Sequence, residues 1–468
     1  MRFGKLIVIG IFFAAVGGGD VCGQATSQVL ATATDGDQSV AAQNPMPGMQ
    51  MPAVPDATMP MPTMNTAGIY LMGRTSGTGA NPESAAMKMF SWRVGGWNLM
   101  FHGQGFISDV QQTGPRGADK FYSTNWFMGM AEHDIGKGAF TIRAMLSAEP
   151  ATITGRYYPE LFQTGETAFG KALVDGQHPH NFFMELSVAY ARTVGEKTNV
   201  EIYFAPVGDP ALGPVAFPHR ISAEELPQAP LSHHLQDSTH IADEVLTAAL
   251  RRPHWGAEVS GFHGAEPGEN RWIIQTGGLD SWSARLSWTP TTNWSAQVSA
   301  GSLQKPEALE PGDQLRSTAS VTYNRPYTSG DWATSVIWGR NHETDTKRNL
   351  NSYLLESVVQ FRKKNYITGR AELVDRDELF ADQPLLEQQL AATVGTVFRI
   401  GAFTAGYTRD IHVLPHVLTG IGGNFTLYKV PDAIQPFYGE HPAAFYLFLR
   451  FRLEGKERGG MKMQSGKN

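Results

Sequence analysis

Cysteine is almost absent from this chain of 468 residues, which contains a single one, Cys22. Arg2 and Lys5 precede an apolar run from Leu6 to Val16, and small residues follow it. This order of features is typical of a secretory signal peptide, which we expect to be residues 1–23. Its removal would leave a mature chain without cysteine, so the fold must do without disulfide bonds in an oxidising compartment.

Long apolar runs and concentrated charge are missing as well. Beyond the expected signal peptide no apolar run reaches the roughly 18 residues that a transmembrane helix requires, so such helices are excluded. The net charge is −6 and no basic block occurs, so nucleic acid is not an expected partner. Glycine, with 50 residues, and aromatic residues, at 10%, are plentiful, and both fit a β-rich protein with many turns.

Residues 24–90 lack hydrophobic periodicity and are rich in Gln, Ala, Thr, Pro, Gly and Met, so we expect a disordered leader. Within it, "MPGMQMPAVPDATMPMPTM" occupies residues 46–64. Its methionines are Met46, Met49, Met51, Met59, Met61 and Met64. Thioethers are soft ligands that suit Cu(I) and Ag(I), so these six residues are candidate metal ligands. A proline-rich linker and a sink for oxidants are the alternative interpretations.

From about residue 91 the sequence alternates with a period of two. In "SWSARLSWTPTTNWSAQVSAG" (residues 281–301), apolar residues alternate with small polar ones on both sides of a turn. Residues 139–146, 331–339, 365–373 and 445–453 show the same alternation. Such a pattern predicts β-strands with one apolar and one polar face.

Connection lengths between the expected strands also alternate. The expected strands are residues 91–107, 119–133, 138–149, 181–194, 198–206, 238–250, 254–264, 279–289, 293–303, 315–325, 331–341, 350–363, 365–376, 388–400, 401–412 and 443–453. Short turns alternate with long connections, notably 150–180, 207–237 and 413–442. We therefore predict an all-β fold: a closed antiparallel transmembrane β-barrel of about 16 strands (14–18) over residues 91–453.

Charged residues fall at positions expected to face the barrel interior. They are Arg143, Glu185, Arg285, Arg370 and Glu372. Inward-facing charge predicts a polar lumen, which these residues could line as a pore or close by pairing.

In architecture the chain resembles bacterial outer-membrane β-barrel proteins. The resemblance implies a location in the outer membrane, with lipid and the barrel-assembly machinery as partners. An even number of strands would place the leader and the polar tail, residues 454–468, together in the periplasm. One departure is the C-terminus, because such barrels often end in an aromatic residue, whereas here the polar tail follows Phe451 and Leu453.

Two finer resemblances concern particular segments. "GQHPHNFFMEL" (176–186) and "HHLQDSTHI" (233–241) are similar to segments of an uncharacterised group of outer-membrane barrels. The methionine-rich leader is similar in layout to the copper-resistance B family, which places such a segment before a barrel. That family usually mixes His and Asp with Met, and this leader has no histidine.

Histidines in two expected external loops form a second candidate site. They are His178, His180, His233, His234 and His240. Imidazole is the commonest neutral metal ligand, and the short motifs HPH and HH place side chains close enough to share an ion. Asp237 and Glu224 or Glu225 are expected companions. The alternative is that these histidines only form hydrogen bonds that order the loops.

Two functions remain open on this basis. The first is a component of copper or silver handling that binds Cu(I) or Ag(I) at the leader, with no other cofactor expected. The second is a general or substrate-specific porin with an incidental leader. An outer-membrane hydrolase with Ser238 as nucleophile is less favoured, because residues this close in sequence rarely converge as a catalytic triad. We therefore expect no enzymatic activity.

Overall fold

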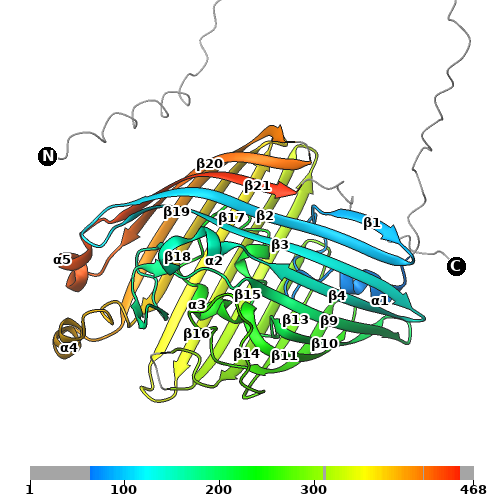
Figure 1. Cartoon of the computed structure of the whole chain (residues 1–468), viewed down its shortest axis with the longest axis horizontal. Coiled ribbons are helices and arrows are strands. Elements are labelled where there is room, and N and C mark those ends of the chain that lie inside the picture. Colours follow the sequence, from blue (N-terminus) through cyan, green and yellow to red (C-terminus); the bar gives the residue numbers. More distant parts are fainter. Residues whose placement is uncertain (1–63, 309–311, 415, 454–468) are drawn as a thin grey trace, which may run out of the picture. The chain divides into compact units, whose positions relative to one another are not determined.

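The computed structural model describes residues 64–308, 312–414 and 416–453. Within these ranges one antiparallel sheet has 17 strands. The first, β1 (Phe90–Val94), pairs with β2 as a hairpin, and the other sixteen close into a barrel because the last strand, β21, pairs with β2 (Figure 1). The predicted fold class and strand number are confirmed.

The sixteen strands of the barrel pair in chain order. They are β2 (Trp97–Gln112), β3 (Asp119–Ile135), β4 (Gly138–Leu146), β9 (Phe183–Val194), β10 (Thr198–Gly208), β11 (Ala242–Arg251), β12 (Trp255–His263), β13 (Ser281–Trp288), β14 (Trp294–Leu303), β15 (Gln314–Tyr327), β16 (Gly330–Glu343), β17 (Asn349–Phe361), β18 (Asn365–Arg376), β19 (Phe398–Leu414), β20 (Val417–Lys429) and β21 (Ala443–Leu453). Each pairs with its neighbour, so no strand crosses over another.

Short elements lie before the barrel and in its loops. The helices are α1 (Thr66–Met72), α2 (Glu149–Thr152), α3 (His233–Gln236), α4 (Pro384–Thr393) and α5 (Gln435–Tyr438). Two small two-stranded sheets pair β5 (Tyr158–Pro159) with β8 (Gly176–Gln177) and β6 (Glu166–Ala168) with β7 (Lys171–Leu173). None of the helices in the described ranges is both long and apolar enough to cross a membrane.

The two ends of the barrel differ in their connections. One end, here called the turn end, has short turns such as those after β3 and β9, whereas the opposite loop end carries the long connections. At the turn end, the Asn65 side chain donates hydrogen bonds to the carbonyls of Gly136 and Gly138. Leu453 pairs with Val417 at that same end. The described chain therefore begins and finishes at the turn end.

The outer surface of the barrel is apolar. Side chains alternate between the two faces of each strand, and those that are exposed outside include Ile202, Val259, Leu286, Val298, Val336, Leu355, Ile367 and Leu447. Trp282, Trp288 and Trp294 are exposed as well, and Trp338 is half-buried beneath Arg340. An apolar band with aromatic residues is the surface that lipid requires.

The inner surface carries buried ion pairs. Arg143 lies 3.2 Å from Glu185, Arg285 lies 2.7 Å from Glu258, and Arg370 lies 3.1 Å from Glu356. The five charged residues expected to face inward are all buried: Arg143, Glu185, Arg285 and Arg370 form ion pairs, and Glu372 accepts hydrogen bonds from the backbone amides of Leu231 and Ser232. A buried charge is tolerated when it has such a partner and further hydrogen bonds.

Two segments fill much of the interior. The N-terminal luminal segment (residues 64–89) places α1 against β4 and β9, where Ala67 and Leu71 are buried, and its Arg74 lies 2.8 Å from Glu201 of the wall. The luminal loop (residues 209–241) reaches strands on several sides of the barrel. Its Arg220 contacts Glu356, and its Gln228 donates a hydrogen bond to Asn424.

The close packing of the luminal loop depends on small wall residues. A Cβ atom added to Gly339 of β16 would overlap with the carbonyl oxygen of Leu235 in α3. Glycine at this position lets the helix backbone lie directly on the wall. In Figure 1, α2 and α3 lie within the outline of the barrel strands.

The expected strand at residues 388–400 is wrong. Its first half belongs to α4, which has Pro384 at its start and the sequence PLLEQQLAAT, made mostly of good helix formers. The expected turn between Ile400 and Gly401 is also wrong, because β19 runs through it. The actual turn lies at His416, which has a φ of 62°, and the region expected as a long connection contains β20. One extra and one missing strand left the count at 16.

The structure also differs from the expected extent of the leader. Residues 64–89, part of the segment expected to be disordered, have defined positions and include α1. Helix α1 can bury apolar side chains against the wall, and Asn65 caps it by accepting a hydrogen bond from the Gly68 amide. Residues 1–63 and the polar tail, 454–468, lie outside the described residues.

Candidate metal centre

The five candidate histidines lie together inside the loop end. Ring centroids are 5.9 Å apart for His178 and His234, 5.3 Å for His233 and His234, and 5.2 Å for His233 and His240. His180 lies 5.3 Å from His240. The expectation that these side chains approach one another is confirmed. The long loops that carry them fold inward, so His233, His234 and His240 are buried.

Local structure explains how each pair of histidines is presented. His178 and His180 flank Pro179 directly after β8, and Glu149 of α2 accepts hydrogen bonds from the backbone amide and ring Nδ1 of His180. His233 and His234 begin the single turn of α3. Glu372 of the wall accepts hydrogen bonds from the amide and hydroxyl of Ser232 and so holds the start of that turn.

Three side chains have the spacing of a metal site. The ligand atoms of Glu166, His178 and His234 all lie within 4.8 Å of one another. His178 Nε2 is 2.7 Å from the Glu166 carboxylate. Ligand bonds of about 2.0–2.2 Å place two nitrogen or oxygen ligands of a tetrahedral ion roughly 3.5 Å apart. Small side-chain shifts would therefore let the three groups hold one ion.

His234 is the least satisfied member of the group. Both of its ring nitrogens are buried and neither has a hydrogen-bond partner among the described residues. Its nearest carboxylate is Glu266, which lies 3.8 Å from Nδ1. Gly165, with a φ of 101°, allows the strand β6 to approach the ring: an added Cβ would lie 3.0 Å from Nδ1. A buried, unpaired imidazole is costly unless a ligand satisfies it.

The protonation states of these groups are compatible with binding of a cation. Burial lowers the pKa of His178 and His234 well below the usual value, so both imidazoles are neutral at pH 7. Burial and the neighbouring Glu166 raise the pKa of Glu266 to about 8, and burial also raises the pKa of Glu166. The two carboxyl groups therefore retain a proton that a metal ion could displace.

A second group of histidines adjoins the first. Each Nδ1 atom is held by an oxygen: His180 by Glu149 at 2.9 Å, His233 by Asp237 at 2.6 Å, and His240 by the Asp237 carbonyl at 2.8 Å. Hydrogen bonding at Nδ1 leaves the Nε2 lone pair available, as in metal-binding histidines with an oriented ring. The buried Nε2 atom of His240 has no partner among the described residues.

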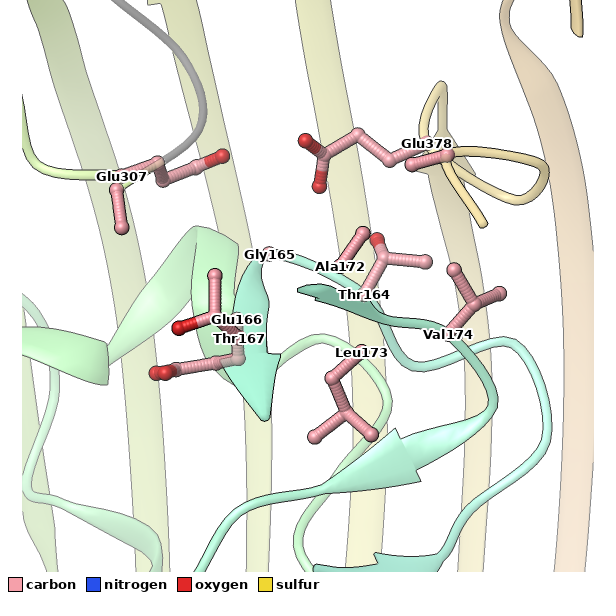
Figure 2. Close-up of a pocket in the computed structure, with 11 residues that line it drawn as sticks. Thr164, Gly165, Glu166, Thr167, Ala172, Leu173, Val174, Glu307 and Glu378 are labelled. Atoms are coloured by element: carbon pink, nitrogen blue, oxygen red, sulfur yellow. The ribbon is translucent and has the colours of Figure 1, made fainter. Parts of the chain in front are cut away.

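A narrow, partly open pocket adjoins the first group (Figure 2). It is lined by Glu166 from β6 and by Glu307 and Glu378 from other long loops, and Figure 2 shows the two latter side chains facing into it. Burial and the nearby Glu266 raise the pKa of Glu307 to about 8. Carboxyl groups around the pocket would favour a cation over an anion.

Sequence reasoning found only part of the site. Asp237 is a companion of His233, as expected. Glu224 and Glu225 pair instead with Arg452, at 3.5 Å and 3.0 Å, although Glu224 also lines a cleft together with His180. Glu166 and Glu266 were missed, because each lies in a loop with no local signal of metal binding.

The candidate nucleophile Ser238 is engaged elsewhere. Arg316 donates a hydrogen bond to its hydroxyl at 2.8 Å. The ring of His240 bonds to a backbone carbonyl, and His233 bonds to Asp237. In the described residues no hydrogen bond joins Ser238 to a histidine, so the geometry of a catalytic triad is not present.

The leader methionines are mostly beyond the described residues. Met46, Met49, Met51, Met59 and Met61 lie outside them. Met64 is half-buried and packs against other methionines of the barrel interior. Metal binding at the six leader positions stays a prediction.

Comparisons with known proteins add no assignment of residues. No family model matches the chain, and no curated protein matches it. Among solved structures, the chain is similar to an anion-selective porin from Comamonas acidovorans (11% identity, TM-score 0.47, covering 76% of this chain and 100% of the porin). It is also similar to Salmonella typhi OmpF in complex with daunomycin (10% identity, TM-score 0.48, 77% and 100%). A third is the outer-membrane channel DcaP of Acinetobacter baumannii (8% identity, TM-score 0.45, 78% and 100%).

Proposed function

We propose that the protein is a porin-like barrel of the outer membrane that is specific for a cation, and that its lumen binds a transition-metal ion. The closed barrel with an apolar outer band supports the membrane location, because no strand edge is left unpaired in lipid. Short turns of such barrels are periplasmic and long loops external. The turn end, with the leader and the tail, would then face the periplasm.

The observation that carries the proposal is the environment of His234. A buried imidazole with two unpaired nitrogens lies beside His178 and Glu166, whose ligand atoms are within 4.8 Å of it. Two imidazoles and a carboxylate suit Zn(II), Ni(II) or Cu(II). The ion is the cargo of the barrel here, and the carboxylate-lined pocket is its approach from the loop end.

Binding of soft metal ions by the methionine-rich leader is a further part of the proposal. Thioethers at Met46, Met49, Met51, Met59, Met61 and Met64 would bind Cu(I) or Ag(I) on the periplasmic side, which suits a role in soft-metal handling. The support is the sequence alone.

A general porin with an incidental leader is the second candidate. Sixteen strands are the size at which barrels usually leave a water-filled channel. Against it, the N-terminal luminal segment and the luminal loop occupy much of that space. A general porin would conduct small ions freely in planar bilayers, whereas the proposed protein would conduct poorly until these segments move.

Calorimetric titration of the purified full chain in detergent with Zn(II), Ni(II) and Cu(II) tests the metal proposal. Glu166→Gln and His234→Phe should each lower the affinity by at least about tenfold, or 1.4 kcal/mol. His342→Phe is the matched control and should leave the affinity unchanged, because this half-buried histidine at the loop end contacts Asn349 and none of the three site residues. Equal titration curves for all the proteins would refute the site.

A further inference from the structure

Every methionine in the described ranges belongs to one cluster inside the barrel. Seven are buried and two are partly buried against them: Met72, Met89, Met100, Met128, Met130, Met145 and Met184, with Met64 and Met87. They come from α1, the N-terminal luminal segment, and strands β2, β3, β4 and β9. Only Val207 and Ile241 are buried apolar members of another type.

Strand register places the methionines beside a histidine. Met128 of β3 pairs with His102 of β2 on one side and with Met145 of β4 on the other. Directly paired residues have Cβ atoms about 5 Å apart, so these three side chains form one row on the inner wall. Met100 and Met130 pair in the next row.

The luminal loop adds a second histidine to this row. His219 Nε2 lies 3.1 Å from the Met145 sulfur, and the His219 ring centroid is 4.3 Å from that of Trp126 and 6.1 Å from that of His102. His102 is buried, and its Nε2 atom has no hydrogen-bond partner among the described residues. Two imidazoles and two thioethers therefore face a common space with one nitrogen unsatisfied.

We propose that Met128, Met145, His102 and His219 form a binding site for a soft monovalent d¹⁰ cation, Cu(I) or Ag(I). Thioether sulfur and imidazole nitrogen together select such an ion over a hard divalent one. No oxidation or reduction is involved, because the ion enters and leaves in the same state. The site is separate from Glu166, His178 and His234, so neither proposal depends on the other.

One pair of ligand atoms already has nearly the spacing that an ion requires. Bonds of about 2.0 Å to nitrogen and 2.3 Å to sulfur place the two ligand atoms roughly 3.5 Å apart at a tetrahedral angle. Met145 and His219 are 3.1 Å apart without an ion. Methionine has three rotatable bonds and His219 lies in a loop, so a shift of a few tenths of an ångström is accessible.

Packing alone does not explain the composition of the cluster. Leucine would fill the same space with better-defined rotamers, and methionine specifies a core poorly. A buried histidine with an unpaired nitrogen destabilises an apolar cluster. Met64, the last methionine of residues 46–64, also packs against this cluster.

Ag(I) binding to the full chain tests the site. The background is a variant in which Met46, Met49, Met51, Met59 and Met61 are replaced by leucine, which removes the leader as a competing site. Adding Met128→Leu with Met145→Leu should abolish one tight Ag(I) equivalent in calorimetry, with Zn(II) binding unchanged. Methionine-to-leucine swaps conserve volume and usually cost less than about 1.5 kcal/mol, so the barrel should still fold.

A second pair of variants separates binding from packing. His219→Phe keeps the ring beside Trp126 and should weaken Ag(I) binding, whereas His254→Phe, in an exposed turn, should not. Absorption spectra at the silver edge should show sulfur and nitrogen neighbours in the background protein, and the sulfur signal should fall in the double leucine variant. Unchanged stoichiometry and spectra in both site variants would show that the methionines only pack.

Discussion

Replacing Arg220 by methionine should release the luminal loop from the barrel wall. The Arg220 guanidinium is buried and bonds to Asp237 at 2.9 Å within the loop, to Glu356 at 2.5 Å on β17, and to the Val215 carbonyl at 3.0 Å. Methionine keeps much of the volume and removes every one of these bonds.

The free-energy cost of the substitution depends on the carboxylates that lose Arg220 as a partner. Removing one partner of a buried ion pair costs about 3–5 kcal/mol. Asp237 keeps His233, and Glu356 keeps Arg370 and Ser222, so neither carboxylate is left alone. We therefore expect the lower value, about 3 kcal/mol, which is a factor of roughly 10² in the balance between docked and undocked loop.

Single-channel recording in planar bilayers measures this balance. The R220M protein should open roughly 10² times more often than the unmodified protein, because an undocked loop clears part of the lumen. R340M, which removes an arginine on the outer surface, is the control and should behave as the unmodified chain. Identical opening in all three proteins would refute the conclusion that the luminal loop closes the barrel.

Three further predictions concern the metal sites and the N-terminal luminal segment. Zn(II) affinity should rise with pH up to about 8 and level off above it, because the Glu266 carboxyl, with its pKa raised to about 8, holds a competing proton below that value; a flat calorimetric profile from pH 6 to 9 would contradict this. Arg74→Met should leave Glu201 without its 2.8 Å partner, and limited proteolysis should cut residues 64–89 faster; unchanged cleavage would mean that this ion pair does not hold the segment. A peptide of residues 44–66 should bind Ag(I) with little dependence on pH, and equal calorimetric heats from its methionine-to-leucine version would favour the linker interpretation.

Strand alternation made the barrel predictable, since each strand has one lipid face and one lumen face. The strand predicted at residues 388–400 was wrong because its first half lies in α4. The sequence PLLEQQLAAT is apolar enough to suggest a strand, but its residues have high helix propensity. The turn at His416 was missed although Pro415 precedes it, because a single proline among apolar residues is a weaker turn signal than pairs such as Asn-Gly or Pro-Gly.

The sites were predictable only where residues are neighbours in sequence. The motifs HPH and HH pointed to four histidines of the site. Glu166 and Glu266 lie near these histidines only because the loops pack together, and no local sequence pattern encodes that packing. The methionine cluster was overlooked for the same reason. Met100, Met128 and Met145 lie on three strands, and only the register between those strands brings them together.

Anomalous X-ray scattering from crystals soaked in Zn(II), recorded at the zinc edge, tests the proposed metal centre most directly. The account predicts a peak about 2.0–2.2 Å from a ring nitrogen of His178, a ring nitrogen of His234 and a carboxylate oxygen of Glu166. Peaks confined to the outer surface, with none among these three side chains, would contradict it.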